Sequence, residues 1–242
     1  MITVNEARGR VRVAAAADLN VALGELIARF IQSHDVEVTV SYGSSGTFYA
    51  QLLNQAPFDL FLSADLRYPN ELVARGLTLP QSEFTYAVGR LVVWAPAASS
   101  LALEHDGLEA LTPASVAHVA IANPEHAPYG RAAIAAMESA GVYDRLRPKL
   151  VFGENVAQAM QFAQSGAADA AVVARSLALA PNVKSAGRVF QIPPASHPRM
   201  DQGGVILRWA ADPDAARALR GFLLSAEGRA ILERSGFALP ER

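Results

Sequence analysis

The stretch Val38-Thr39-Val40-Ser41-Tyr42-Gly43-Ser44-Ser45-Gly46-Thr47-Phe48-Tyr49-Ala50-Gln51-Leu52-Leu53 predicts a strand, a tight turn and a helix in succession. β-Branched residues favour the strand, and the glycines allow a sharp turn before an amphipathic helix begins. The first N–H groups of that helix have no intrahelical acceptor, and with two serine hydroxyls they could bind a small oxyanion. No lysine or arginine lies in the turn. Neutral dipoles would therefore hold the anion.

Two other interpretations of this turn are possible. Serine and glycine before a helix are common as ordinary caps, and a lone Gly-Ser-Ser-Gly turn is more often a cap than a binding site. The nucleophile turn of serine hydrolases, Gly-x-Ser-x-Gly, requires glycine where this chain has Thr47. The binding interpretation gains weight because the same construction recurs elsewhere in the chain.

Composition limits the classes of function. The chain has 242 residues, of which 51% are apolar and 18% charged, and its formal net charge is -2. These values favour a globular protein with a sizeable core and disfavour nucleic acid or an acidic membrane surface as a partner. The absence of cysteine excludes disulfides. The N-terminal stretch Met1–Arg10 is polar and lacks the apolar segment of a signal peptide, so an exported form is expected to have lost its signal.

Predicted strands and helices alternate along the chain. This alternation favours parallel sheets covered on both faces, which bind ligands at the carboxyl ends of their strands. The predicted strands are 11–16, 36–42, 58–65, 119–122, 150–152, 170–173 and 203–207, and helices are predicted to follow at 17–30, 47–53, 69–75, 131–139, 156–165, 213–224 and 226–235. Asn155 is a good N-cap for the helix that Gly166 ends.

Two segments suggest that the chain passes between two lobes. The extended stretch 84–94, interrupted by Gly89, could cross from one lobe to the other, and the stiff segment 193–198 could bring the chain back. A two-lobed body with a double crossover is the simplest arrangement of these elements.

The motifs in these turns, together with their order and spacing, carry a resemblance that extends from Val11 to Pro240. They are Ala15-Ala16-Ala17-Asp18-Leu19, Gly43-Ser44-Ser45-Gly46, Ala56-Pro57-Phe58-Asp59-Leu60-Phe61-Leu62-Ser63-Ala64-Asp65, Asn123-Pro124-Glu125-His126-Ala127-Pro128-Tyr129-Gly130 and Glu154-Asn155-Val156. The chain resembles the periplasmic molybdate-binding proteins of bacterial ABC importers, which are type II solute-binding proteins. The resemblance implies an α/β fold of two lobes, with mixed, mostly parallel sheets flanked by helices and a ligand cleft between the lobes. It places residues 1–85 and 203–242 in one lobe and residues 86–202 in the other.

The resemblance also implies a set of ligand-binding residues. Ser45 matches a hydroxyl ligand of the family, whereas Ala17, Tyr129 and Val156 match positions that would offer backbone N–H groups. Asp18 lies beside Ala17 at the first turn, and we expect its N–H to face the ligand while its carboxylate turns away and accepts hydrogen bonds from its own helix. The chain departs from the family pattern at Ala17, which lacks a hydroxyl, and at Val173, where some members have a tyrosine.

The function implied by the resemblance is binding of molybdate or tungstate and delivery to the membrane permease of an ABC transporter. On this interpretation the protein is a monomer of the periplasm and not an enzyme, and it needs no cofactor and no metal other than molybdenum in the bound oxyanion. The alternative ligands are sulfate and phosphate; phosphate would need a proton acceptor, and Asp18 is the only acid in the matched turns.

A serine hydrolase is the alternative from another class of protein. Ser44, Ser45, His126 and His197 could in principle contribute to a triad, but no histidine lies in a favourable sequence context. Arg131 could reach an anion, although an exposed position on its helix is the simpler interpretation. The tyrosines Tyr42, Tyr49 and Tyr86 are interpreted as packing residues.

Overall fold

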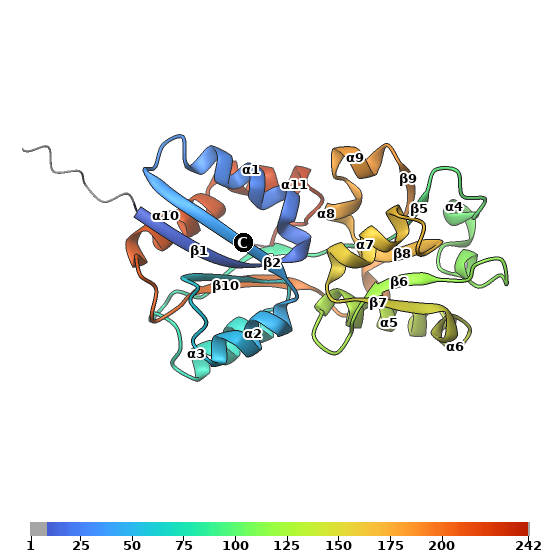
Figure 1. The fold of residues 1–242 in the computed structure, drawn as a ribbon, viewed down its shortest axis with the longest axis horizontal. Coiled ribbons are helices and arrows are strands. Elements are labelled where there is room, and N and C mark those ends of the chain that lie inside the picture. The colour runs from blue at the N-terminus through green and yellow to red at the C-terminus, as the bar shows by residue number, and fades with distance from the viewer. Residues whose placement is uncertain (1–8, 242) are drawn as a thin grey trace, which may run out of the picture.

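The computed structural model describes residues 9–241. The N-terminal stretch in which we expect no signal peptide lies almost entirely outside these residues. Two lobes lie side by side along the long axis of the molecule, and each is built on a five-stranded sheet with helices on both faces (Figure 1). Within residues 9–241, no helix is both long enough and apolar enough to span a bilayer.

The first lobe contains the beginning and the end of the chain. Its sheet has the order β2-β1-β3-β10-β4, in which β1 is parallel to β2 and β3, and β10 is antiparallel to β3 and β4. The strands are β1 (Gly9–Ala16), β2 (Val36–Gly43), β3 (Leu60–Ser63), β4 (Phe84–Val88) and β10 (Asp201–Ile206). The helices are the 3-10 turn η1 (Ala17–Leu19), α1 (Asn20–Phe30), α2 (Ser45–Leu53), α3 (Arg67–Ala74), α10 (Pro213–Leu224) and α11 (Ala226–Arg234).

Side chains that alternate along the strands divide the core of this lobe into two layers. Val13 of β1 and Leu62 of β3 pack under α1, α10 and α11, whereas Ala14 and Phe61, their neighbours in sequence, pack under α2 and α3. Successive side chains of a strand point to opposite faces, so each face of the sheet needs its own cover of helices. The layer of α2 and α3 places the Gly-Ser turn at the edge that faces the second lobe (Figure 1).

The second lobe is built from the middle of the chain. Its sheet has the order β7-β6-β8-β5-β9, with two parallel and two antiparallel pairings. The strands are β5 (Leu91–Pro96), β6 (Val119–Ala122), β7 (Leu150–Gly153), β8 (Ala170–Ala174) and β9 (Gly187–Gln191). The helices are α4 (Leu103–Asp106), η2 (Glu109–Leu111), α5 (Pro128–Ser139), α6 (Tyr143–Leu146), η3 (Arg147–Lys149), α7 (Val156–Gln164), α8 (Arg175–Ala178) and α9 (Pro181–Lys184), with η4 (Pro194–Ser196) on the return segment.

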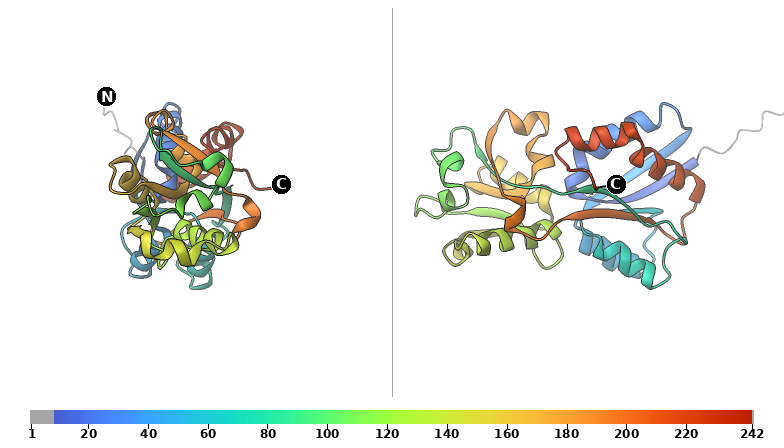
Figure 2. Two further views of the ribbon diagram at one scale, coloured as in Figure 1. Left: turned by 90° about the vertical axis from the view of Figure 1, so that its right-hand side faces the viewer. Right: turned by 180° about the vertical axis from the view of Figure 1, so that it is seen from behind.

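The chain crosses between the sheets twice, as the sequence suggests. It leaves the first sheet after Val88 and enters the second at Leu91, and it returns between Gln191 and Asp201. Figure 2 shows the connecting segments from behind. The lobe boundaries given above, 85/86 and 202/203, fall inside β4 and β10. Half of the pairings in each sheet are antiparallel, more than we expected, because one strand of each sheet, β10 in the first and β5 in the second, runs against the others and is paired on both sides.

Two local predictions differ from the structure. Helix α5 begins at Pro128 and not at Arg131, because proline is well suited to the first helical position, where no N–H is needed. The helix predicted over 17–30 begins as the 3-10 turn η1 before α1, which shifts the helical phase and leaves Val21 39% exposed.

Candidate functional site

The five predicted site residues come together around one cavity between the lobes. Ala17, Asp18, Ser45, Tyr129 and Val156 are all buried, and they line a small cavity with about 10 Å³ of space for the centre of a water-sized sphere. The remaining lining residues are Ala16, Gly43, Ser44, Ala64, Ala127, Pro128 and Asn155. No lysine, arginine or histidine is among the described residues that line this cavity, so it is a site of neutral donors with one carboxylate, Asp18.

The two serines of the Gly-Ser turn have different tasks. Ser44 caps α2, because its Oγ accepts a hydrogen bond from the Thr47 N–H at 3.2 Å and lies 2.7 Å from the Thr47 Oγ1. Ser45 Oγ accepts the N–H of Ala64 at 3.0 Å, in a fully buried contact. A hydroxyl that accepts from the backbone keeps its own hydrogen for another acceptor. Ser45 is thus held in place with a donor available at the cavity.

The second lobe presents two helix starts to the cavity. Pro128 has no N–H, so Tyr129 carries the first N–H of α5, and a first-turn N–H has no acceptor within its helix. At α7, the Asn155 side chain accepts from the N–H groups of Ala157 and Gln158, at 3.0 and 3.1 Å. This cap leaves the N–H of Val156 as the free donor at the positive end of the helix.

Gly130 allows α5 to begin close to the end of β6. A Cβ at this position would lie 2.1 Å from the carbonyl oxygen of Ala122. No side chain can approach a backbone oxygen so closely, and any residue larger than glycine would push the helix start away from the cavity. The predicted motif Pro128-Tyr129-Gly130 is therefore explained by packing as well as by its N–H group.

Asp18 is the point at which both lobes and the returning strand meet. Its Oδ2 accepts hydrogen bonds from the Tyr129 hydroxyl at 2.9 Å and from the Gln202 Nε2 at 2.5 Å. Its main-chain oxygen accepts a third from the Ser176 hydroxyl at 2.8 Å. Gln202 is fixed in turn by the hydroxyl of Tyr86, which donates to its Oε1 at 3.0 Å. The N–H groups of Asp18 and Leu19 act on the carboxylate, as the expected orientation requires, but the side-chain hydrogen bonds to it come from partners far away in the sequence, which we did not expect.

Burial changes the acidity of this group. Desolvation raises the pKa of Asp18 to about 6, against the opposing effects of the hydrogen bonds from Gln202 and Tyr129 and of the N–H groups of Asp18 and Leu19. Its second oxygen, Oδ1, is buried without a hydrogen-bond partner. Burial beside Asp18 also raises the pKa of Tyr129 and of Tyr86, so both tyrosines stay neutral donors.

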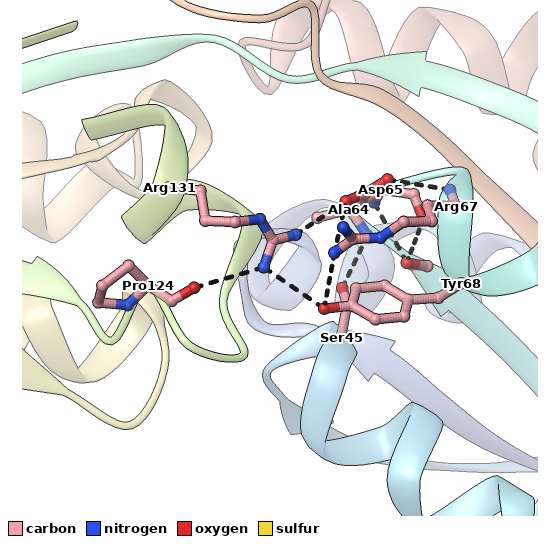
Figure 3. A network of polar contacts seen from close by, with 8 residues as sticks. Ser45, Ala64, Asp65, Arg67, Tyr68, Pro124 and Arg131 are labelled. Atoms are coloured by element: carbon pink, nitrogen blue, oxygen red, sulfur yellow. Dashed lines mark hydrogen bonds and ion pairs between the residues drawn. The ribbon is translucent and has the colours of Figure 1, made fainter. Parts of the chain in front are cut away.

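Arg131 does not belong to the cavity, in agreement with the simpler interpretation of its sequence position, but it is not merely a solvated side chain. Its guanidinium leaves α5 and reaches the first lobe, where it pairs with Asp65 at 2.8 Å (Figure 3). Tyr86 and Tyr49 are packing residues as predicted, the first in the core and the second against the ring of Tyr68.

The residues of the hydrolase alternative do not assemble. The Oγ of Ser44 contacts Thr47 and that of Ser45 contacts the Ala64 N–H, whereas the His126 ring lies toward Glu154, with Nε2 and Oε2 3.7 Å apart. His197 bonds to the neighbouring Pro198 carbonyl. Val173 is buried within β8 and does not line the cavity. Among residues 9–241 there is also no group of three histidine or acidic side chains suited to a metal ion.

Three contributors to the site were missed from the sequence. The hydroxyl of Tyr129, the amide of Gln202 and the hydroxyl of Ser176 all act on Asp18 from positions more than 100 residues away. None of the three is part of a motif at a fixed distance from Asp18. The local sequence indicates only that Asp18, a polar residue, lies just after a strand, in a turn that resembles a ligand-binding turn.

Comparison with known proteins agrees with this geometry. Residues 11–238 match the model of a family described as bacterial extracellular solute-binding protein. The chain is 38% identical over 231 residues to the molybdate-binding protein ModA of Rhodobacter capsulatus, covering 96% of this chain and 89% of that one, and 34% identical to ModA of Azotobacter vinelandii, covering 95% and 90%. The solved structure of the periplasmic molybdate-binding protein of Azotobacter vinelandii superimposes with a TM-score of 0.88 at 32% identity, over 96% of this chain and all of that one. The predicted two-lobed type II architecture is confirmed by this agreement.

Proposed function

The chain belongs to the family of bacterial extracellular solute-binding proteins, and we infer that it binds molybdate in the cavity between its lobes. One observation carries the inference: helix starts from both lobes and the Ser45 hydroxyl meet at a buried cavity that has no cationic side chain among its lining residues. Such a site offers neutral donors to several oxygens of an anion at once. The names of the relatives supply the identity of the anion.

The proposed ligand contacts come from five residues. Ser45 donates its hydroxyl, and Ala17, Asp18, Tyr129 and Val156 donate backbone N–H groups to the oxygens of the oxyanion. These contacts involve the oxo groups and not the molybdenum atom, so the site needs no protein ligand for a metal. Tungstate has the same charge and shape as molybdate and is proposed to bind as well.

The remaining parts of the proposal follow from the family. The protein acts by binding and not by catalysis, without a cofactor, and passes the oxyanion to the permease of an ABC transporter. We propose that it does so as a monomer in the periplasm. Neither the binding of the oxyanion nor its transfer to the permease involves nucleic acid. The low net charge of the chain disfavours nucleic acid as a partner.

Thermal unfolding with a series of oxyanions tests the proposal. A ligand at about 1,000 times its dissociation constant adds roughly 4 kcal/mol to the free energy of unfolding, which for a protein of this size raises the midpoint by on the order of 10 °C. We expect this rise with molybdate and tungstate and a much smaller one with sulfate and phosphate. An unchanged midpoint in millimolar molybdate would contradict the proposal, and tight phosphate binding that disappears in Asp18→Asn would identify a phosphate receptor instead.

A further inference from the structure

Outside the oxyanion cavity, one ion pair among residues 9–241 joins the two lobes. Arg131 lies on α5 of the second lobe, two residues after Tyr129, and its Nη2 donates to Asp65 Oδ2 of the first lobe at 2.8 Å. Its Nη1 also reaches the hydroxyl of Tyr68 at 3.4 Å and the carbonyl oxygen of Pro124 at 3.5 Å (Figure 3). The side chains of Arg131 and Asp65 are 31% and 28% exposed, so the pair is partly shielded from water.

Asp65 is held firmly by its own turn. The Ser63 hydroxyl donates to the main-chain oxygen of Asp65 at 2.8 Å, and the Asp65 N–H donates back to the Ser63 Oγ at 3.1 Å. Its Oδ1 accepts the N–H of Arg67 at 2.9 Å, which leaves Oδ2 for Arg131. A partner fixed in this way adds little to the ordering entropy of an ion pair, which favours a measurable contribution.

The same turn supports the cavity. Ala64, next to Asp65, donates its N–H to Ser45, and Ala64 itself lines the cavity. On the opposite side, α5 carries both Arg131 and the Tyr129 N–H. Arg131 is therefore two residues away from a proposed contact of the oxyanion, and Asp65 is one residue away from the N–H group that orients Ser45.

The two lobes also meet beside this pair. The Gly46 N–H donates to the carbonyl oxygen of His126 at 2.9 Å, and Ala16, Ala17 and Ala64 of the first lobe pack into the apolar core of the second. These contacts require the lobes to be closed. The N–H groups of Tyr129 and Val156 can reach an anion on Ser45 in the same closed arrangement only.

We propose that Arg131 and Asp65 form an interlobe latch that stabilises the closed state and thereby sets the lifetime of the bound oxyanion. This proposal rests on the proposed function. Both residues are positioning residues, because neither of them lines the cavity or contacts the anion. Opening the lobes breaks the ion pair and withdraws the second-lobe N–H groups together, so the latch acts mainly on the rate of release.

The chain contains a matched control for this latch. Arg67 also lies near Asp65, 3.6 Å from its Oδ2, and its guanidinium lies over the Tyr68 ring, but Arg67 and Asp65 belong to the same lobe. Arg67→Gln and Arg131→Gln remove the same charge from the same neighbourhood. Because both variants remove one positive charge, both lose a similar long-range attraction for the anion. Only Arg131→Gln also removes a contact between the lobes.

The test measures the release of radioactive molybdate into an excess of unlabelled molybdate. We expect Arg131→Gln to raise the dissociation rate by about two- to fivefold, as for other partly exposed ion pairs, and Arg67→Gln to leave it nearly unchanged. Asp65→Asn, which keeps an acceptor for the Arg67 N–H, should match Arg131→Gln, and the double variant should add nothing further. Arg131→Lys should restore part of the native rate. Small-angle scattering should show more open molecules in Arg131→Gln than in Arg67→Gln at equal subsaturating molybdate.

The outcomes separate the two proposals. If the native protein binds no molybdate, the proposed function fails. If the native protein binds molybdate but Arg131→Gln releases it at the native rate, the latch fails and the function stands. Equal acceleration in Arg67→Gln would overturn the latch in favour of simple charge attraction, as would slower release in Asp65→Asn. Fully additive acceleration by Asp65→Asn and Arg131→Gln would show that the two residues do not act as a pair, and would also overturn the latch.

Discussion

The two lobes contribute different kinds of groups to the cavity. The first lobe contributes, beside the proposed N–H groups of Ala17 and Asp18, two polar side chains: the hydroxyl of Ser45, oriented by the Ala64 N–H, and the carboxylate of Asp18. The second lobe contributes the starts of α5 and α7, where the proposed donors are the N–H groups of Tyr129 and Val156. The first half should therefore be sensitive to the identity of its residues, and the second half to the geometry of its helices.

The largest effect should come from the side-chain half. Ser45→Ala removes a hydrogen bond to a charged ligand, which costs about 1.5 to 3 kcal/mol, or roughly tenfold to a hundredfold in affinity. Ser44→Ala is the matched control, since it removes only the cap of α2 and should lower stability by about 1 kcal/mol with a small effect on affinity. Titration calorimetry on both variants decides the matter. Equal affinities in Ser45→Ala and the native protein would remove Ser45 from the site.

The next effect concerns Asp18 and pH. Its pKa is about 6 without ligand, and a dianion beside it raises that pKa further, so above pH 6 binding takes up a proton. Affinity for molybdate should then be constant below about pH 6 and fall with rising pH above it, by at most about tenfold per pH unit. The number of protons taken up can be measured by calorimetry in buffers of different ionisation enthalpy.

Asp18→Asn is the control for this dependence, because the amide oxygen can still accept from Tyr129 and Gln202 while the charge is gone. Its affinity should not vary between pH 6 and 8, and at pH 8 it should equal or exceed the native affinity. The ligand-free native protein should also lose stability relative to this variant as pH rises from about 4 to 6, because the raised pKa favours the folded state only while Asp18 is protonated. A steep pH dependence that persists in Asp18→Asn would contradict this assignment.

The smallest effect should come from the helix-geometry half. Asn155→Ala removes two hydrogen bonds that cap α7, which costs about 1 kcal/mol of stability and should weaken molybdate binding a few-fold because the Val156 N–H is less well oriented. Ser225→Ala removes a similar cap from α11, whose residues do not line the cavity, and should cost similar stability without changing affinity. If both variants bind molybdate equally well, the start of α7 does not contact the ligand.

Much of the cavity could be predicted because its parts are local. Ser45 and Val156 each lie at a helix start that is recognisable from a few neighbouring residues, the Gly-Ser turn in one case and the Asn155 cap in the other. The extended stretch 84–94 and the stiff segment 193–198 likewise indicated both crossings between the lobes. Local rules suffice wherever one turn of a helix determines the direction of an N–H group.

What could not be predicted depends on distant partners or on short elements. Asp18 was expected to cap its own helix, but Tyr129 and Gln202 lie 111 and 184 residues away in the sequence and provide buried donors that the local N–H groups do not replace. The ion pair of Arg131 with Asp65 is equally non-local. The four-residue helices and the edge strand β9 are too short or too little buried to give a periodic pattern.

The most direct test of the proposed molybdate site is a structure from crystals grown with molybdate, in which the anomalous signal of molybdenum locates the ion. We expect one strong peak between the lobes, with oxo groups about 2.7 to 3.1 Å from the Ser45 Oγ and from the backbone nitrogens of Ala17, Asp18, Tyr129 and Val156. A peak outside this cavity, or an oxyanion in the cavity bound to lysine or arginine side chains, would contradict the account.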